Sequence, residues 1–172
     1  MELSEVIRKR RSIRKFKDDP IPKEMINEII KSAMFAPSAV NRRPVHLLVI
    51  ENRETIEKIR KLRVSAFRFL ETAPLAIVIA VENVGTWESD GAIVGAFIQL
   101  TCVDLGLDSC WGHIAGIAED EARKLLNIPE RYRVLCVIGI GYPDEEKSPH
   151  DESEIDEKRI HWERFDTCIF IG

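Results

Sequence analysis

Apolar side chains recur every three or four residues in several parts of the chain, which is the spacing of an amphipathic helix. A short helix is expected around Val6 and Ile7, ahead of a basic run from Arg8 to Lys17. The longer stretches with this spacing are Met25–Met34, Arg53–Leu70 and Glu119–Leu126. Prolines follow the first two of them, and proline cannot continue a helical hydrogen-bond ladder. The pattern therefore predicts one short and three longer amphipathic helices.

Other stretches are apolar without a helical period, which favours β-strands. They are Val45–Ile50, Leu75–Val81, Ser109–Ile114 and Tyr132–Gly141. Leu75–Val81 is almost wholly apolar, so we expect it in the middle of a sheet with helices on both faces.

The stretch from Ser89 to Gly106 is apolar around most of a helix rather than along one stripe. A helix of this kind is expected to be deeply buried. Gly91 and Gly95 would let a neighbouring element approach its axis closely. Gly106 stands where glycine commonly ends a helix.

No linker separates two apolar cores, so residues 1–172 are predicted to form a single domain. The fold class is α+β, a sheet of four or five strands with helices packed on its faces. Residues 144–158 are polar and charged and are predicted to form a loop. The apolar tail that follows, residues 160–172, is expected to pack on a partner subunit, because a monomer of this size would not leave it exposed.

Composition narrows the classes of function. The net charge of -4 and the pI of about 5.7 argue against a general attraction to nucleic acid. No apolar run approaches the roughly 20 residues that span a bilayer, and the N-terminus lacks the pattern of a signal peptide. We therefore expect a cytoplasmic protein without membrane association. The four cysteines form no C-x-x-C pair and are expected to be reduced, and the spacing of the four histidines predicts no metal site.

Two polar motifs could carry chemistry. Arg10, Arg11, Ser12 and Arg14 follow the first helix, and arginine side chains bind phosphate oxygens in bidentate fashion. The same cluster could instead be a solvated basic face or an arm that contacts nucleic acid. Ala36–Pro44 is a loop stiffened by two prolines, and it could present polar groups to a flat ligand or simply end a helix and turn.

A third motif lies at the end of the long apolar helix, where Gly106 is followed by Trp111, Gly112 and His113. Gly112 could let the backbone approach a ring ligand, but a packed tryptophan in a strand explains the same residues. His113 is more readily explained as a structural histidine than as a metal ligand.

The order of these motifs resembles the nitroreductase family of FMN enzymes. Arg10–Arg14 resembles the R-R-S-x-R opening of that family, and Ala36–Pro44 is similar to its A-P-S-x-x-N-x-Q-P loop. Ala96–Gly106 with Trp111 resembles its buried helix ending in G-L-x-x-x-W, and Lys158-Arg159 resembles its closing basic pair. The resemblance covers essentially the whole chain. It implies a three-layer fold with a mostly antiparallel sheet, in an intertwined homodimer.

The resemblance also implies roles for individual residues. Arg10, Arg11, Ser12 and Arg14 would hold the phosphate and ribityl chain of FMN, with Lys158 and Arg159 completing the phosphate site. Pro37, Ser38 and Asn41 would line the flavin from the partner subunit. The backbone around Trp111, Gly112 and His113 would face the isoalloxazine ring near N5.

The implied function is hydride transfer from NADH or NADPH to a small acceptor such as a nitroaromatic or quinone. No side chain is assigned as a catalytic acid or base, because the flavin carries the chemistry. An FMN enzyme of the same fold with a dehalogenation or dehydrogenation reaction, and a non-catalytic nucleic-acid-binding protein, stay open as alternatives. The physiological acceptor and the choice between NADH and NADPH stay open too, as does whether another protein supplies electrons.

Two positions depart from the family pattern. Arg43 stands where the family commonly has Gln, and Val45 stands where an aromatic residue often follows the proline. We therefore expect Arg43 to line the substrate pocket and to change its charge.

Overall fold

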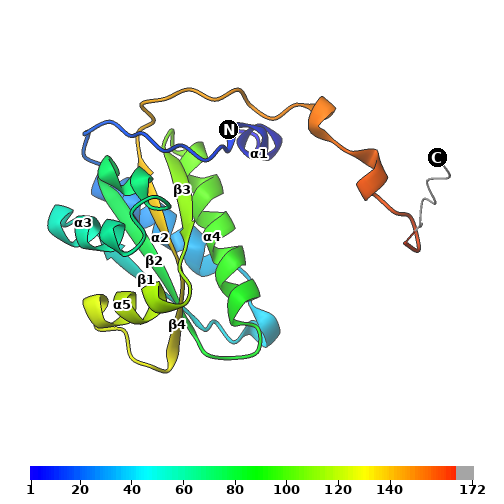
Figure 1. Ribbon diagram of the computed structural model, residues 1–172. Coiled ribbons are helices and arrows are strands. Elements are labelled where there is room, and N and C mark those ends of the chain that lie inside the picture. Colours follow the sequence, from blue (N-terminus) through cyan, green and yellow to red (C-terminus); the bar gives the residue numbers. More distant parts are fainter. Residues whose placement is uncertain (166–172) are drawn as a thin grey trace.

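A four-stranded antiparallel sheet forms the centre of the computed structural model, which describes residues 1–165 (Figure 1). Its strands lie in the order β1-β2-β4-β3. They are β1 (Val45–Ile50), β2 (Leu75–Glu82), β3 (Asp108–His113) and β4 (Tyr132–Gly141). As predicted, the almost wholly apolar stretch becomes a central strand, and seven of the eight residues of β2 are buried.

Helices cover both faces of the sheet (Figure 1). One layer holds α2 (Lys23–Phe35) and α4 (Trp87–Asp104), and the other holds α3 (Arg53–Leu62) and α5 (Ile117–Leu126). Successive residues of a strand point to opposite faces. Ile77 and Ile79 of β2 accordingly pack in the α2 and α4 core, while Ala76 and Val78 pack in the α3 and α5 core. The three-layer α+β fold expected from the sequence is confirmed.

The helix predicted from Arg53 to Leu70 is wrong in its second half. The α3 helix ends at Leu62, where Arg63 leaves helical geometry with φ of -146°, and a short 3-10 turn (Arg68–Glu71) follows. Phe67 and Phe69 are fully or almost fully buried after this break. They fill the space above Gly112 and Gly139 of the sheet, where an added Cβ would lie less than 3 Å from their rings. Packing of these rings therefore overrides the helical spacing.

The long apolar helix is also less buried than the sequence predicts. Within one chain, α4 buries Val94, Ile98 and Cys102, but Ala96 is exposed and Ile93 is 37% exposed. The close approach expected at glycine does occur, because the Trp111 ring occupies the space that a Cβ on Gly95 would need. One apolar face of α4 is thus left for another surface to cover.

The chain after β4 first returns along the body of the protein and then leaves it. Residues 144–150 run beside residues 8–15, and two short 3-10 turns (Glu152–Glu154 and Glu157–Arg159) follow on a segment that projects outward (Figure 1). The predicted loop is therefore partly ordered by short turns. Cys168 and most of the apolar tail lie outside the described residues, and the other three cysteines are free and buried.

Within residues 1–165, every helix is too short or too polar to cross a bilayer.

Candidate cofactor site

The arginine motif lies where α1 (Leu3–Lys9) ends and the chain meets the start of β3. Ser12 bridges to Ser109, and the Ile13 N–H donates to the Ser109 carbonyl at 3.1 Å. We call Arg10, Arg11, Ser12 and Arg14 the clamp. These hydrogen bonds fix the backbone of the clamp beside the first residues of β3. The Arg14 side chain stays exposed, and its Nη1 donates to the Ser12 carbonyl at 3.3 Å.

Residues 144–150, which we call the strap, hold the clamp from the other side. The Asp144 N–H donates to the Lys15 carbonyl at 2.9 Å, and the His150 N–H donates to the Arg8 carbonyl at 2.8 Å. The Arg11 guanidinium donates to the Ser148 carbonyl, and the Lys147 ammonium donates to the Ser12 carbonyl. Lys147 therefore adds a further positive charge to the clamp.

A cavity of about 710 Å³ lies between the clamp, the strap and the end of α4. Lys9, Arg11 and Lys147 line it, together with three acidic residues, Asp108, Glu145 and Glu146. Burial raises the pKa of the Asp108 carboxyl to about 6, although the nearby charges of Arg10 and Lys147 act in the opposite direction. The lysine and arginine donors suit an anion such as a phosphate monoester, while the three acidic groups offset their charge.

The loop from Ala36 to Pro44 is held at the other end of α4. Asp90, in the first turn of that helix, is 2% exposed and accepts hydrogen bonds from the Ala39 N–H at 2.9 Å and the Thr86 hydroxyl at 2.7 Å. The Ser38 hydroxyl accepts from the Arg43 N–H at 2.8 Å, and the Asn41 side-chain oxygen accepts from Arg43 Nε at 3.1 Å. The structure thus brings Ser38, Asn41 and Arg43 together, with Pro37 next to them in the chain.

This loop has an unusual backbone. Val40, Asn41 and Arg43 all adopt left-handed conformations, with φ of 48°, 54° and 55°. Such angles are unfavourable for a residue with a Cβ, above all for β-branched valine, and they persist where surrounding contacts enforce them. The Asp90 and Ser38 hydrogen bonds supply this enforcement, so the loop is preorganised within one chain.

The clamp and the loop are far apart within a single chain. The amino group of Met1 binds Asp104 at the C-terminal end of α4, next to the clamp, whereas Asp90 anchors the loop at the N-terminal end. An 18-residue helix is about 27 Å long at 1.5 Å per residue. One mononucleotide cannot contact both ends, so a ligand shared by the two motifs requires two chains.

Trp111, Gly112 and His113 form the end of β3, the strand that starts at the clamp. Trp111 packs on Gly95 of α4, and the missing side chain of Gly112 makes room for Phe67 and Phe69. His113 is exposed, and its carbonyl accepts a hydrogen bond from Arg63 Nη1 at 2.7 Å. The strand from Asp108 to His113 spans about 17 Å at roughly 3.3 Å per residue.

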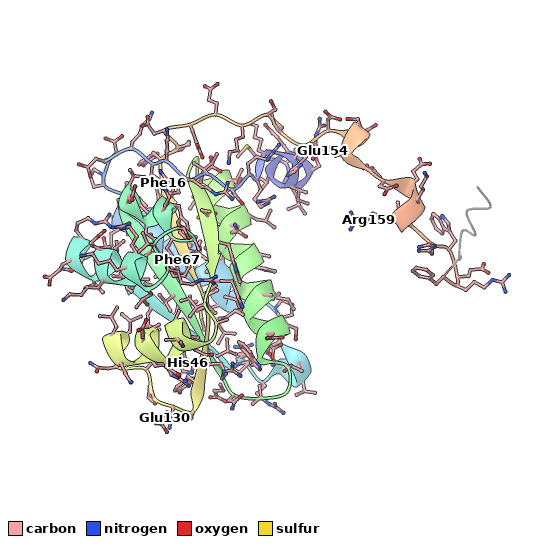
Figure 2. All side chains as sticks on the ribbon, in the orientation of Figure 1. Phe16, His46, Phe67, Glu130, Glu154 and Arg159 are labelled. Carbon is pink, nitrogen blue, oxygen red and sulfur yellow. The ribbon has the colours of Figure 1, made fainter. Side chains whose placement is uncertain are left out.

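Lys158 and Arg159 belong to the last 3-10 turn, on the projecting segment. Figure 2 shows Arg159 well away from the sheet and helices. The structure therefore does not bring this pair to the clamp of the same chain.

Several residues of the site escaped the sequence prediction: Asp90, Asp108, Lys147, His150 and Arg63. Each is distant in sequence from the motif it supports, so only the tertiary fold reveals the contact. Within residues 1–165, no cluster of three or more His, Cys, Asp or Glu side chains is arranged to hold a metal ion.

Comparison with known proteins identifies the family of the chain. Residues 7–78 and 63–142 match the nitroreductase family. An FMN-dependent nitroreductase from Clostridium difficile R20291 has a structure with a TM-score of 0.91 and 36% sequence identity, covering 94% of this chain and 99% of that one. The chain belongs to the nitroreductase family and is an NAD(P)H oxidoreductase.

Two curated relatives indicate the range of activity in such proteins. A Methanothermobacter thermautotrophicus protein, provisionally named NADH dehydrogenase/NAD(P)H nitroreductase, is 36% identical over 172 residues, 96% of this chain and 88% of the relative. An iodotyrosine deiodinase of Thermotoga neapolitana is 23% identical over 180 residues, 89% of this chain and 95% of that protein.

Proposed function

We propose that this protein binds FMN in a homodimer and transfers hydride from NADH or NADPH to a small acceptor such as a nitroaromatic or quinone. The observation that carries the proposal is the position of the clamp and the loop at opposite ends of α4. A second chain, packed on the apolar face of α4, would place its own loop near the clamp of the first.

The residues present fit such a cofactor. Arg10, Arg11, Ser12 and Arg14 would hold the phosphate and ribityl chain, beside the cavity described above. Lys158 and Arg159 would complete the phosphate site once the projecting segment docks in the assembled dimer. Pro37, Ser38 and Asn41 would line the flavin from the partner subunit.

The far end of β3 would lie at the ring. FMN, when bound, would supply the redox chemistry by accepting hydride at N5 and passing it on. The backbone around Trp111, Gly112 and His113 would face the ring. Arg63 would hold this backbone in place through its hydrogen bond to the His113 carbonyl. We assign no side chain as a proton donor. Arg43, at the loop, would act at the mouth of the substrate pocket.

Exposed apolar surface supports the homodimer. Ile93 on α4 is 37% exposed, and Trp162 and Phe165 on the projecting segment are 82% and 78% exposed. Surfaces of this kind on one chain mark an interface, because isolated monomers seldom leave them to solvent. We expect light scattering to give about twice the chain mass of 19.7 kDa at every dilution that keeps the protein folded. A stable folded monomer would overturn the two-chain site.

The test of the function is the visible spectrum of the purified protein, followed by anaerobic addition of NADH or NADPH. We expect a yellow protein that releases FMN on denaturation and bleaches with at least one nicotinamide. A colourless protein that does not bind added FMN would refute the proposal, and would revive the nucleic-acid-binding alternative.

A second reaction is favoured by one comparison. The similarity to an iodotyrosine deiodinase brings reductive dehalogenation of a halogenated phenol into consideration. Parallel turnover assays with menadione, a nitroaromatic and an iodinated phenol, each with the same nicotinamide, distinguish the two reactions by their ratios of kcat/KM.

A further inference from the structure

His150 lies at the end of the strap, between an acidic side chain and the clamp. Its Nδ1 lies 2.7 Å from Glu154 Oε2, and its Nε2 lies 3.4 Å from Arg10 Nη2. The strap holds the ring in place, because the His150 backbone exchanges two hydrogen bonds with Arg8, at 2.8 and 3.1 Å. In Figure 2, Glu154 accordingly lies beside α1, at the clamp end of the molecule.

The partners of the ring determine where its protons are. A carboxylate accepts hydrogen bonds, so Nδ1 must carry a hydrogen that it donates to Glu154. A guanidinium has no acceptor, so Nε2 facing Arg10 must be unprotonated. A ring with this tautomer satisfies both contacts and occupies a donor group of Arg10. This hydrogen bond from His150 also lowers the pKa of the Glu154 carboxyl below its ordinary value.

A phosphate beside Arg10 would reverse these requirements. Phosphate oxygens need donors, and the lone pair of neutral Nε2 would repel them. A proton on Nε2 would turn the ring into a donor and release Arg10 Nη2. The Glu154 carboxylate would then compensate the positive charge of the ring. We propose that His150 is a further phosphate-binding residue of the clamp, which takes up a proton at Nε2 when the cofactor phosphate enters and then donates to it alongside Arg10.

This proposal rests on the proposed function, because it takes the FMN phosphate as the anion. The proposal goes beyond that function because it adds a residue outside the arginine motif and couples phosphate binding to protonation. Free phosphate shares the chemistry of the FMN phosphate, so the experiment below avoids phosphate buffers.

Other charged groups near the ring must be kept constant in any test. The carboxyl of Asp108 has its pKa raised to about 6, which lies just below the pH range of the experiment described next. The charged groups around His150 from α1, the clamp and its own segment are Arg8, Arg10, Arg11, Asp151 and Glu154, and Asp108 of β3 lies near Arg10. All of them remain in a His150→Gln variant, so a comparison with the unsubstituted protein isolates the ring.

The experiment measures the Kd for FMN by quenching of flavin fluorescence at pH 6.5 and at pH 8.5. This range stays above the second pKa of about 6 of a phosphate monoester, so the ligand itself changes little. We expect the affinity of the unsubstituted protein to rise about fivefold more than that of His150→Gln on going from pH 8.5 to pH 6.5. Riboflavin, which lacks the phosphate, should show no such difference.

His46→Gln is the matched control, because it removes an exposed imidazole at the opposite end of the molecule (Figure 2). It should behave like the unsubstituted protein. The same pH dependence in His150→Gln as in the unsubstituted protein, or in riboflavin as in FMN, would overturn the inference. If neither protein bound FMN at either pH, the proposed function itself would fail, which is a different result.

A second measurement needs no variant, in case His150→Gln does not fold. NMR titration of the His150 ring should show that bound FMN raises the pH at which the ring loses its proton, and bound riboflavin should leave it unchanged. An identical titration with and without FMN would contradict the proposed proton uptake.

Discussion

The two ends of α4 hold their functional residues by different means. At the N-terminal end, a buried carboxylate, Asp90, fixes a loop with three left-handed residues. At the C-terminal end, the clamp is held by backbone and exposed or half-buried side-chain groups of the strap, and most of its guanidinium and hydroxyl groups remain at least partly exposed. One end is rigid before any ligand arrives, and the other is adjustable.

This difference matches what each end is proposed to contact. A flat ring is recognised by the shape of a preformed surface, whereas a flexible phosphate chain is held by charge. A rigid loop lowers the entropy that binding must overcome. The contrast leads to predictions that range from a large effect on stability to a small effect on kinetics.

The largest effect is expected from Asp90→Ala. This change removes a buried acceptor of two hydrogen bonds and leaves the strained loop without its anchor. Unfolding in urea should show a loss of about 3 kcal/mol in the free energy of unfolding. Asp90→Asn keeps one acceptor oxygen and should cost about 1 kcal/mol. A loss below about 0.5 kcal/mol for Asp90→Ala would mean that the loop does not depend on this carboxylate.

At the clamp, Arg14→Ala should leave stability almost unchanged, because the side chain is exposed. It should instead weaken FMN binding by about 1.5 to 3 kcal/mol, the range for hydrogen bonds to a charged group. Titration by fluorescence quenching measures this change, with riboflavin as the comparison ligand. Undiminished FMN affinity would remove Arg14 from the phosphate site.

Asp108, which lines the cavity beside the clamp, is expected to have a smaller, pH-dependent effect on stability. Folding raises the pKa of Asp108 from 3.8 to about 6, so the folded state binds this proton more tightly and its contribution to stability is lost as pH rises through about 6. Asp108→Asn should therefore raise the unfolding temperature relative to the unsubstituted protein more at pH 7.5 than at pH 4.5. Thermal unfolding at both values tests this, and an equal difference at the two pH values would contradict the raised pKa.

The smallest effect is expected from Arg43→Gln, which removes one exposed charge near the proposed pocket mouth. The KM for the nicotinamide should rise about threefold, in keeping with exposed charge interactions of under about 1 kcal/mol, while FMN affinity stays the same. Arg42→Gln removes the same charge one residue earlier and serves as the control. With menadione as acceptor, both variants should keep the parallel double-reciprocal lines of a shared site. Intersecting lines would show that donor and acceptor bind together.

Much of the fold was predictable from hydrophobic spacing, and the exceptions have physical causes. The strands of the sheet began and ended within one residue of their predicted positions, and three of them, β1, β2 and β4, are β-branched apolar runs with few alternatives. The end of α3 was missed, since burial of Phe67 and Phe69 over two glycines outweighs local helical spacing. The burial of α4 was misjudged because the spacing of apolar residues does not tell whether the same chain covers them.

The candidate site was predictable only in part. The motifs themselves stand out in the sequence, and the family match covers residues 7–78 and 63–142. What the sequence did not reveal is which distant residues hold them. Asp90 lies 51 residues from Ala39, and His150 lies 140 residues from Arg10. A lone Asp in an apolar helix and a lone His in a polar loop carry no local signal of such contacts.

The central claim is that one cofactor site combines the clamp of one chain with the loop of another. Mixed dimers of two variants test it most directly: Arg10→Ala with Arg14→Ala in one chain, and Ser38→Ala with Asn41→Ala in the other. Each variant alone should form a dimer that retains no FMN. The mixed dimer should regain one FMN per two chains, because one of its two sites then has an intact clamp and an intact loop. A mixed dimer that binds no FMN, although it forms and folds, would contradict the shared site.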